Sequence, residues 1–156
     1  MIVPAAAAAR AMPASPSSCA IRWIATGATS TGIDTGVPST VVAAVDRGNY
    51  PVVSFHTADG DTRDWYPSLI TARGDECLYG LNAACHQDDP DWALLRSFKR
   101  QLAMRGPTVP IALGTGALTP LELLAAFLAQ LQCDLVTRSN LRLTPQEPLE
   151  AVIAVP

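Results

Sequence analysis

The segment Gly32-Ile33-Asp34-Thr35-Gly36 places one aspartate between two glycines. Glycine lets a backbone approach a ligand closely and adopts dihedral angles that other residues resist. Backbone N–H groups in such a turn can donate hydrogen bonds to phosphate oxygens. A neighbouring aspartate can bind Mg²⁺ directly or through water. The pattern therefore indicates a candidate phosphate and Mg²⁺ site, and a glycine-rich turn without any ligand stays open as the alternative.

Lys99 is the single lysine of a chain whose other positive residues are arginines. A lysine ammonium is a compact point charge that can contact several phosphate oxygens at once. The alternative role for Lys99 is that of a solvated cation at a helix end, where the helix dipole favours positive charge.

The four cysteines, Cys19, Cys77, Cys85 and Cys133, include no closely spaced pair. Cys77, Cys85 and His86 are three potential zinc ligands, although structural zinc sites usually contain a closely spaced pair. Ordinary core or surface positions are the alternative. The low cysteine density is far from that of a disulfide scaffold and favours a reducing, cytoplasmic location.

The composition limits the class of protein. The chain has 156 residues, 49% of them hydrophobic and 16% charged, which is typical of one folded domain. No apolar run approaches the roughly 18 residues of a membrane-spanning helix, so we expect no membrane-embedded segment. The net charge of −3 offers no basic excess for a phosphate backbone, so we expect no nucleic-acid partner.

The first half of the folded region is predicted to consist of short strands. β-branched and apolar runs at 40–45 and 50–55, around the turn residues 46–49, predict a hairpin over 39–55. A loop is expected at 59–61. Two more short strands are expected at 68–72 and 77–79, around a turn at 73–75.

The second half is predicted to be mainly helical. We expect a short helix at 81–85, a longer one at 91–104 and a connector at 105–116. The longer helix is predicted because four apolar residues follow helical spacing: Trp92, Leu95, Phe98 and Leu102.

A third helix is predicted to begin at a capping box. Thr119 and Glu122 can exchange hydrogen bonds, with Pro120 at the first helical position. Leucines at helical spacing then predict the buried face: Leu121, Leu124, Leu128, Leu131 and Leu135. The apolar run 149–155 predicts a strand covered on both faces, so the elements together indicate an α/β layer fold.

The amino-terminal segment differs from the rest of the chain. Residues 1–20 are rich in alanine, proline and serine, and their prolines prevent one continuous helix. We expect residues 1–29 to be a disordered extension and residues 1–20 to be dispensable for stability. Because a buried strand at 149–155 usually leads into further structure, we also expect the sequence to be a fragment of a longer protein.

Taken together, these segments resemble the DnaK-type heat shock protein 70 chaperones of the actin-like ATPase superfamily. GIDTG before a strand-turn-strand is similar to that superfamily's first phosphate loop. Three further segments are similar in order and approximate spacing: Tyr66-Pro67-Ser68, Phe98-Lys99-Arg100 and Ala151–Pro156. The resemblance covers residues 30–156.

The resemblance implies a fold and an activity. The fold would be the first part of lobe I of a ribonuclease H-like nucleotide-binding domain, with a mixed sheet and helices. The full-length protein would bind ATP or ADP with Mg²⁺ and couple hydrolysis to binding of unfolded polypeptides. Its further partners would be a J-domain co-chaperone and a nucleotide exchange factor. The second phosphate loop is missing, so we expect no steady ATP hydrolysis by this chain alone.

The resemblance also implies residue roles. Asp34 matches the aspartate that works with Mg²⁺ and its waters, and Lys99 matches the lysine that contacts the transferred phosphate and the attacking water. Gly36, Val37, Pro38 and Ser39 match the phosphate-contacting turn.

The match departs from the family at two positions of the turn. The family usually carries two threonines where this chain has Val37 and Pro38. Val37 lacks a hydroxyl, and Pro38 lacks both a hydroxyl and a backbone N–H. The departures leave open a degenerate non-catalytic interaction module of the same fold. A fragment of a sugar-kinase-like phosphotransferase is a second alternative, because GIDTG alone also fits that branch of the superfamily.

Overall fold

The computed structural model describes residues 29–35, 39–44, 49–96, 98–141, 143 and 149–154, and for residues 29–32, 34, 35, 99 and 149–154 it describes the backbone alone. The predicted extension 1–29 and the turn at 46–49 therefore lie outside the described residues, except for Thr29 and Asn49. The elements in chain order are β1 (Thr29–Thr35), β2 (Ser39–Ala44), β3 (Phe55–His56), β4 (Thr62–Arg63), β5 (Tyr66–Pro67), β6 (Leu69–Arg73), β7 (Glu76–Tyr79), α1 (Gly80–Ala84), β8 (Ala93–Arg96), α2 (Phe98–Arg105), β9 (Ile111–Leu113), β10 (Gly116–Leu118), α3 (Pro120–Thr137) and β11 (Leu149–Ala154).

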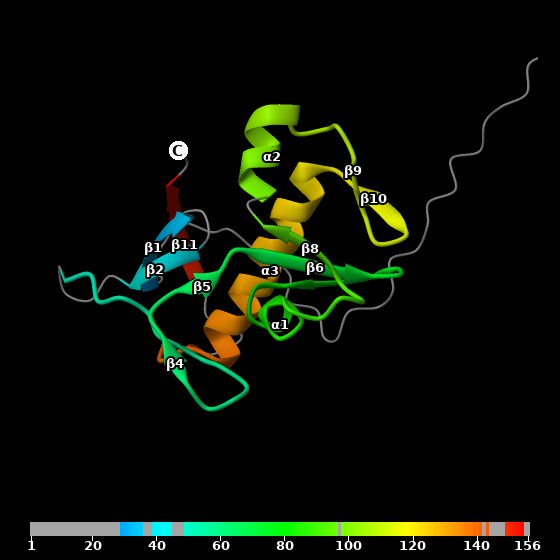
Figure 1. Ribbon diagram of the computed structural model, residues 1–156. Helices are drawn as coiled ribbons and strands as arrows, with labels where there is room; N and C mark the ends of the chain where they lie inside the picture. Colours follow the sequence, from blue (N-terminus) through cyan, green and yellow to red (C-terminus); the bar gives the residue numbers. More distant parts are fainter. Residues whose placement is uncertain are drawn as a thin grey trace, which may run out of the picture.

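The described strands include a mixed four-stranded sheet with the order β11-β1-β2-β5 (Figure 1). β1 pairs in parallel with β11, from Thr29 opposite Leu149 to Asp34 opposite Ala154. β1 pairs antiparallel with β2, and β2 pairs antiparallel with β5. The predicted strand over 149–155 is therefore confirmed, and it lies in the same sheet as the start of the predicted hairpin.

The predicted hairpin over 39–55 is shorter than expected. An antiparallel bridge joins Ala43 to Val52, which confirms the return of the chain along β2. Phe55 no longer belongs to that pairing, because it begins β3 and pairs with β4. The connection between β3 and β4 is the predicted loop, where Gly60 has a φ of 88°.

The second sheet has the order β7-β6-β8 and corrects one prediction. The hairpin of β6 and β7 is confirmed around Gly74, which has a φ of 59°, and the short predicted helix is confirmed as α1. The predicted helix over 91–104 is wrong at 93–96, which form β8 against β6, and α2 begins only at Phe98. Pairing with β6 satisfies those backbone groups of 93–96 that face it, and the helical spacing of side chains does not reveal such a partner.

The predicted connector at 105–116 also contains regular structure. Residues of β9 and β10 form a two-stranded hairpin, and Ile111 and Leu113 of β9 are buried. Thr115 N in its turn donates a 2.9 Å hydrogen bond to Gly74 O of the β6–β7 turn. The hairpin is thus fixed to the second sheet by its tip.

The helix α3 begins with the predicted capping box. Glu122 Oε2 accepts a 2.8 Å hydrogen bond from Thr119 N, and Thr119 Oγ1 accepts a 3.2 Å hydrogen bond from Glu122 N. The predicted buried face is shifted, since Leu121 is 55% exposed. The buried apolar side chains of the helix interior are Leu123, Phe127, Leu131 and Leu135. Two apolar stripes are available on this helix, and the aromatic contacts of Phe127 select the one that is buried.

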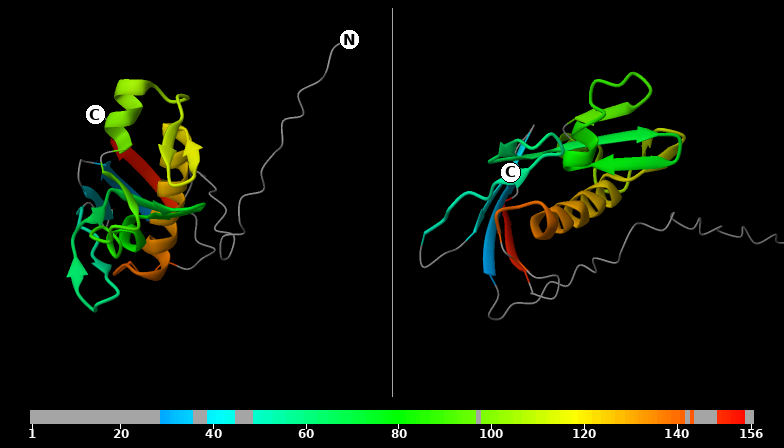
Figure 2. Two further views of the ribbon diagram at one scale, coloured as in Figure 1. Left: turned by 45° about the vertical axis from the view of Figure 1, so that its right-hand side comes forward. Right: turned by 90° about the horizontal axis from the view of Figure 1, so that it is seen from below.

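The core is continuous across both sheets and α3. The Tyr66 ring lies 5.1 Å from Phe55 and 5.7 Å from Phe127, and Phe127 lies 4.9 Å from Phe98. Figure 2 shows α3 running beside β11 and β1 and along one side of the second sheet. Within the described part of the chain, no helix has the length and apolar character needed to cross a bilayer. The molecule is a mixed α/β fold.

Candidate functional site

Asp34 lies at the carboxyl end of β1, one residue before the strand ends. Its backbone is paired with Ala154 of β11 on one side and with Val41 of β2 on the other. Because β1 and β11 run in parallel, their carboxyl ends meet at this edge of the sheet. The connecting residues 36–38, which include the candidate phosphate ligands Gly36, Val37 and Pro38, lie outside the described residues.

The hydroxyl groups after this turn differ in their environment. Ser39 begins β2, is half-buried and pairs with Pro67 of β5. Thr40 is completely buried, and its Oγ1 lies 2.9 Å from Ser68 Oγ in a hydrogen bond between the two side chains. The Thr40 hydroxyl is therefore engaged in the core, and Ser39 remains the candidate of this pair for contact with a phosphate.

Lys99 is the second residue of α2, and its neighbours fix the position of its backbone. Phe98 is 1% exposed, and its ring lies 4.9 Å from that of Phe127 in α3. In Figure 1, α2 lies toward the same end of the molecule as the carboxyl end of β11. The backbones of Asp34 and Lys99 thus lie toward the same end of the molecule, and the structure describes neither side chain.

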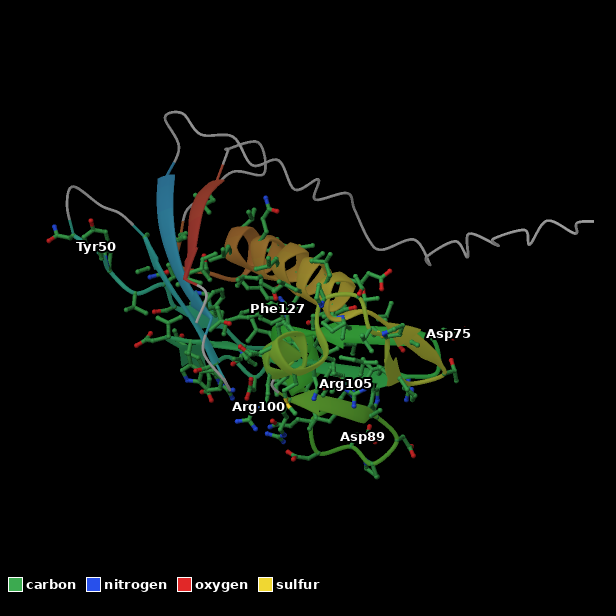
Figure 3. All side chains as sticks on the ribbon, turned by 90° about the horizontal axis from the view of Figure 1, so that it is seen from above. Tyr50, Asp75, Asp89, Arg100, Arg105 and Phe127 are labelled. Atoms are coloured by element: carbon green, nitrogen blue, oxygen red, sulfur yellow. The ribbon has the colours of Figure 1, made fainter. Side chains whose placement is uncertain are left out.

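The electrostatics of this region are positive along α2. The helix contains no acidic residue, and Arg100 and Arg105 are both exposed. Figure 3 shows Arg100 on the side of α2 that lies toward β1, and Arg105 at the other end of the helix. Cations next to the carboxyl ends of parallel strands suit an anionic ligand.

A buried polar pair that sequence reasoning did not predict joins β5 to the last turn of α3. The Tyr66 hydroxyl donates a 2.6 Å hydrogen bond to Asp134 Oδ2, and both residues are at most 1% exposed. The other carboxylate oxygen accepts from Gln130 Nε2 at 3.2 Å and lies 3.7 Å from Arg138 Nε. Arg138 Nη1 in turn donates to Asn82 Oδ1 at 2.9 Å, which links α3 to α1.

Burial changes the acidity of this pair. Desolvation raises the pKa of Asp134 above its ordinary value, although the Tyr66 hydrogen bond and the Arg138 charge act in the opposite direction. Desolvation, followed by the charge of Asp134, raises the pKa of Tyr66 well above its ordinary value. The tyrosine therefore stays a hydrogen-bond donor at neutral pH. The sequence signal that could have indicated this buried pair is the position of Asp134 on the apolar face of the predicted helix, between Leu131 and Leu135.

The three potential zinc ligands are not brought together. Cys77 is half-buried in β7, and burial raises its thiol pKa, whereas Cys85 is exposed and His86 half-exposed after α1. Across the residues that the structure describes, no group of three His, Cys, Asp or Glu side chains is arranged to hold a metal ion. The Asp34 side chain is outside that description, so this result does not bear on the candidate Mg²⁺ ligand.

Neither the models of known protein families nor the curated proteins contain a match to this chain.

Proposed function

We propose that this chain is the amino-terminal part of a nucleotide-binding domain similar to that of the heat shock protein 70 chaperones. The phosphates of ATP or ADP would lie at the carboxyl end of β1. In the full-length protein, nucleotide binding and hydrolysis would be coupled to binding of unfolded polypeptide. A J-domain co-chaperone and a nucleotide exchange factor would be its partners. The finer fold that this proposal requires is the actin-like, ribonuclease H-like lobe.

The proposal rests on one juxtaposition. Asp34 is the penultimate residue of β1, which pairs in parallel with β11, and Lys99 is the second residue of α2, which lies toward the same end of the molecule. Ligands of open α/β sheets bind outside the carboxyl ends of the strands. Asp34 therefore lies at the edge where a phosphate ligand is expected, and the helix that carries Lys99 lies toward the same end of the molecule.

In this proposal, the negative Asp34 would bind Mg²⁺ and the positive Lys99 would bind phosphate. A carboxylate oxygen of Asp34 has the hard donor chemistry that Mg²⁺ prefers, either directly or through water. Lys99 would contact the terminal phosphate and balance its charge. The turn from Gly36 to Ser39 would supply backbone N–H groups, except at Pro38.

A non-catalytic interaction module is the second candidate, and one observation favours it. Thr40, the first threonine after the turn, uses its hydroxyl within the core, since it bonds to Ser68. Together with Val37 and Pro38, this leaves few donors for a phosphate. Each hydrogen bond to a charged partner contributes about 1.5–3 kcal/mol, so loss of two or three would weaken binding severely.

A titration of the isotope-labelled full chain with ATP and Mg²⁺, followed by amide NMR spectra, tests the proposal. We expect shifts confined to residues 34–40 and 98–100, with a Kd in the millimolar range, equivalent to ~4 kcal/mol. Lys99→Ala and Asp34→Asn should each weaken binding at least about tenfold, the equivalent of ~1.4 kcal/mol. Arg63→Gln, a cation lost from β4, is the control and should leave binding unchanged. Absence of shifts, or shifts elsewhere, would favour the interaction module.

A further inference from the structure

The charges of the central part of the chain are separated along the sequence. Three aspartates, Asp88, Asp89 and Asp91, precede β8, and no acidic residue follows until Glu122. The cations of that interval are Arg96, Lys99, Arg100 and Arg105. An acidic loop is therefore followed directly by a cationic strand end and helix.

The exposed members of the two groups do not neutralise each other within the molecule. Arg96, Arg100 and Arg105 are exposed, as are Asp88 and Asp91. Among the residues whose side chains the structure describes, ion pairs join Arg73 to Glu76 and Arg138 to Asp134, and His86 Nδ1 lies 3.9 Å from Asp89 Oδ2. None of these pairs links the acidic loop to β8 or α2.

The two groups lie on one side of the molecule. In Figure 3, Asp89 of the acidic loop and Arg100 and Arg105 of α2 all point to the same side. We call the exposed charged residues of the acidic loop, the end of β8 and α2 the charged face: Asp88, Asp91, Arg96, Arg100 and Arg105.

The acidic loop is held in place by aromatic stacking. The His86 ring stacks on Trp92 at a centroid distance of 4.5 Å, and the Arg73 guanidinium lies 4.6 Å above the Trp92 ring. His86 also pairs with Asp89 at 3.9 Å, and Asp91 N donates to Asp89 Oδ1 at 3.0 Å. The acidic half of the charged face is therefore presented by an ordered loop, which reduces the entropy lost on binding.

We propose that the charged face binds a second copy of this chain around a twofold axis. In such a pairing, the same surface of both copies meets, so the acidic loop of one copy faces the arginines of the other. A surface with adjacent patches of opposite charge is complementary to itself in this arrangement. A polyanion such as a nucleic acid or an acidic peptide would be attracted to the arginines but repelled by Asp88 and Asp91.

The contact is expected to be weak and sensitive to salt. Exposed ion pairs contribute little individually and are screened over about 10 Å at 0.1 M salt. Met104 is 73% exposed on α2 and follows Arg100 by one helical turn, so it offers an adaptable apolar contact beside the charges. We therefore expect a reversible dimer that forms at high protein concentration and low salt.

Sedimentation equilibrium of the full chain without nucleotide, at low and at high salt, tests the proposal. We expect a monomer–dimer equilibrium whose Kd rises at least about tenfold between ~0.05 and ~0.5 M salt. Arg100→Glu/Arg105→Glu and Asp88→Arg/Asp91→Arg should each be monomeric, and an equimolar mixture of the two variants should recover a heterodimer. Asp88→Arg/Asp91→Arg leaves residues 34–40 and 98–100 unchanged, so nucleotide binding of this variant tests the proposed function separately.

The control reverses charges away from this face. Asp61→Arg/Arg63→Glu changes the β3–β4 hairpin and should leave the dimer unaffected. Because a doubly reversed variant can fail to fold, Arg100→Gln provides a milder change and should weaken the dimer severalfold with an unaltered circular dichroism spectrum. A monomeric wild type at low salt, a dimer indifferent to Arg100→Gln, or folded reversed variants that fail to recover a heterodimer would overturn the proposal.

Discussion

Tyr66 and Asp134 are joined by a buried hydrogen bond of 2.6 Å that ties β5 to α3. The pair connects the small strand at the edge of the first sheet to the helix that runs along both sheets. Its position between Phe55 and Phe127 also fixes the aromatic centre of the core.

Removal of the Tyr66 hydroxyl is predicted to destabilise the fold. Tyr66→Phe keeps the ring but leaves a buried carboxylate oxygen of Asp134 without its donor, which costs about 1–3 kcal/mol. Urea unfolding of the purified chain measures the change. Tyr50→Phe is the matched control, because Tyr50 is 69% exposed and its hydroxyl is solvated. Equal effects of the two substitutions would contradict the structural role of the pair.

Asp134 is predicted to give the stability a specific pH dependence. Since its pKa in the folded state is raised above 3.8, the folded protein binds this proton more tightly than the unfolded chain does. The resulting stabilisation is complete below the unfolded pKa and is lost as the pH rises through the folded pKa. The stability of wild type relative to Asp134→Asn should therefore increase as the pH falls from 7 toward 4. Urea unfolding at a series of pH values tests this, and a constant difference would contradict it.

Two glycines with the same backbone angle are predicted to respond differently to alanine. Gly74 and Gly80 both have a φ of 59°, so either substitution carries the cost of a left-handed residue, about 1–2 kcal/mol. At Gly80 a Cβ would overlap the Tyr66 ring and hydroxyl, whereas at Gly74 nothing lies within 4 Å. Gly80→Ala should cost ~1–3 kcal/mol more than Gly74→Ala. Thermal and urea unfolding of both variants provide the comparison.

The capping box is predicted to contribute measurably to α3. Thr119→Ala removes the acceptor of the Glu122 N–H and should cost about 1 kcal/mol. The exposed Thr108 lies in a turn before β9, and Thr108→Ala serves as the control with little expected change. If the free energy of unfolding of Thr119→Ala equalled that of wild type, packing alone would determine where α3 begins.

If the chain binds nucleotide, the turn substitutions are predicted to limit affinity. Val37→Thr/Pro38→Thr restores two hydroxyls and one N–H to the proposed phosphate loop. ATP binding should tighten at least about tenfold, equivalent to ~1.4 kcal/mol, and should still require Mg²⁺ because Asp34 is retained. Calorimetric titration with and without Mg²⁺ compares the variant with wild type. Equal affinities would place the phosphates elsewhere or favour the interaction module.

Local sequence signals correctly predicted the elements whose ends are set by neighbouring residues. The capping box fixed the start of α3, and the turn residues around Gly74 fixed the β6–β7 hairpin. The hydrophobic pattern was not sufficient where contacts with residues distant in sequence determine the secondary structure or the burial of a side chain. The segment 93–96 has helical spacing but pairs with β6, and Leu121 has the hydrophobicity of Leu123 without its core neighbours.

The candidate site shows the same division. Residue types alone singled out Asp34 and Lys99, whereas the parallel pairing that sets the position of the Asp34 backbone joins residues far apart in sequence, which sequence patterns do not specify. The buried pair of Tyr66 and Asp134 was missed because an acid within an apolar helix stripe is interpretable only once its donor is known.

The parallel pairing of β1 with β11 has a consequence during synthesis on the ribosome. Thr29 pairs with Leu149 in this ladder, so β1 cannot complete its pairing on this side before β11 has been synthesised. Such non-local pairing forms slowly because the closure of a long loop precedes any gain from it. Until residues 149–154 leave the exit tunnel, the edge of β1 that will pair with β11 stays open in the nascent chain, where an unpaired strand edge is prone to aggregation.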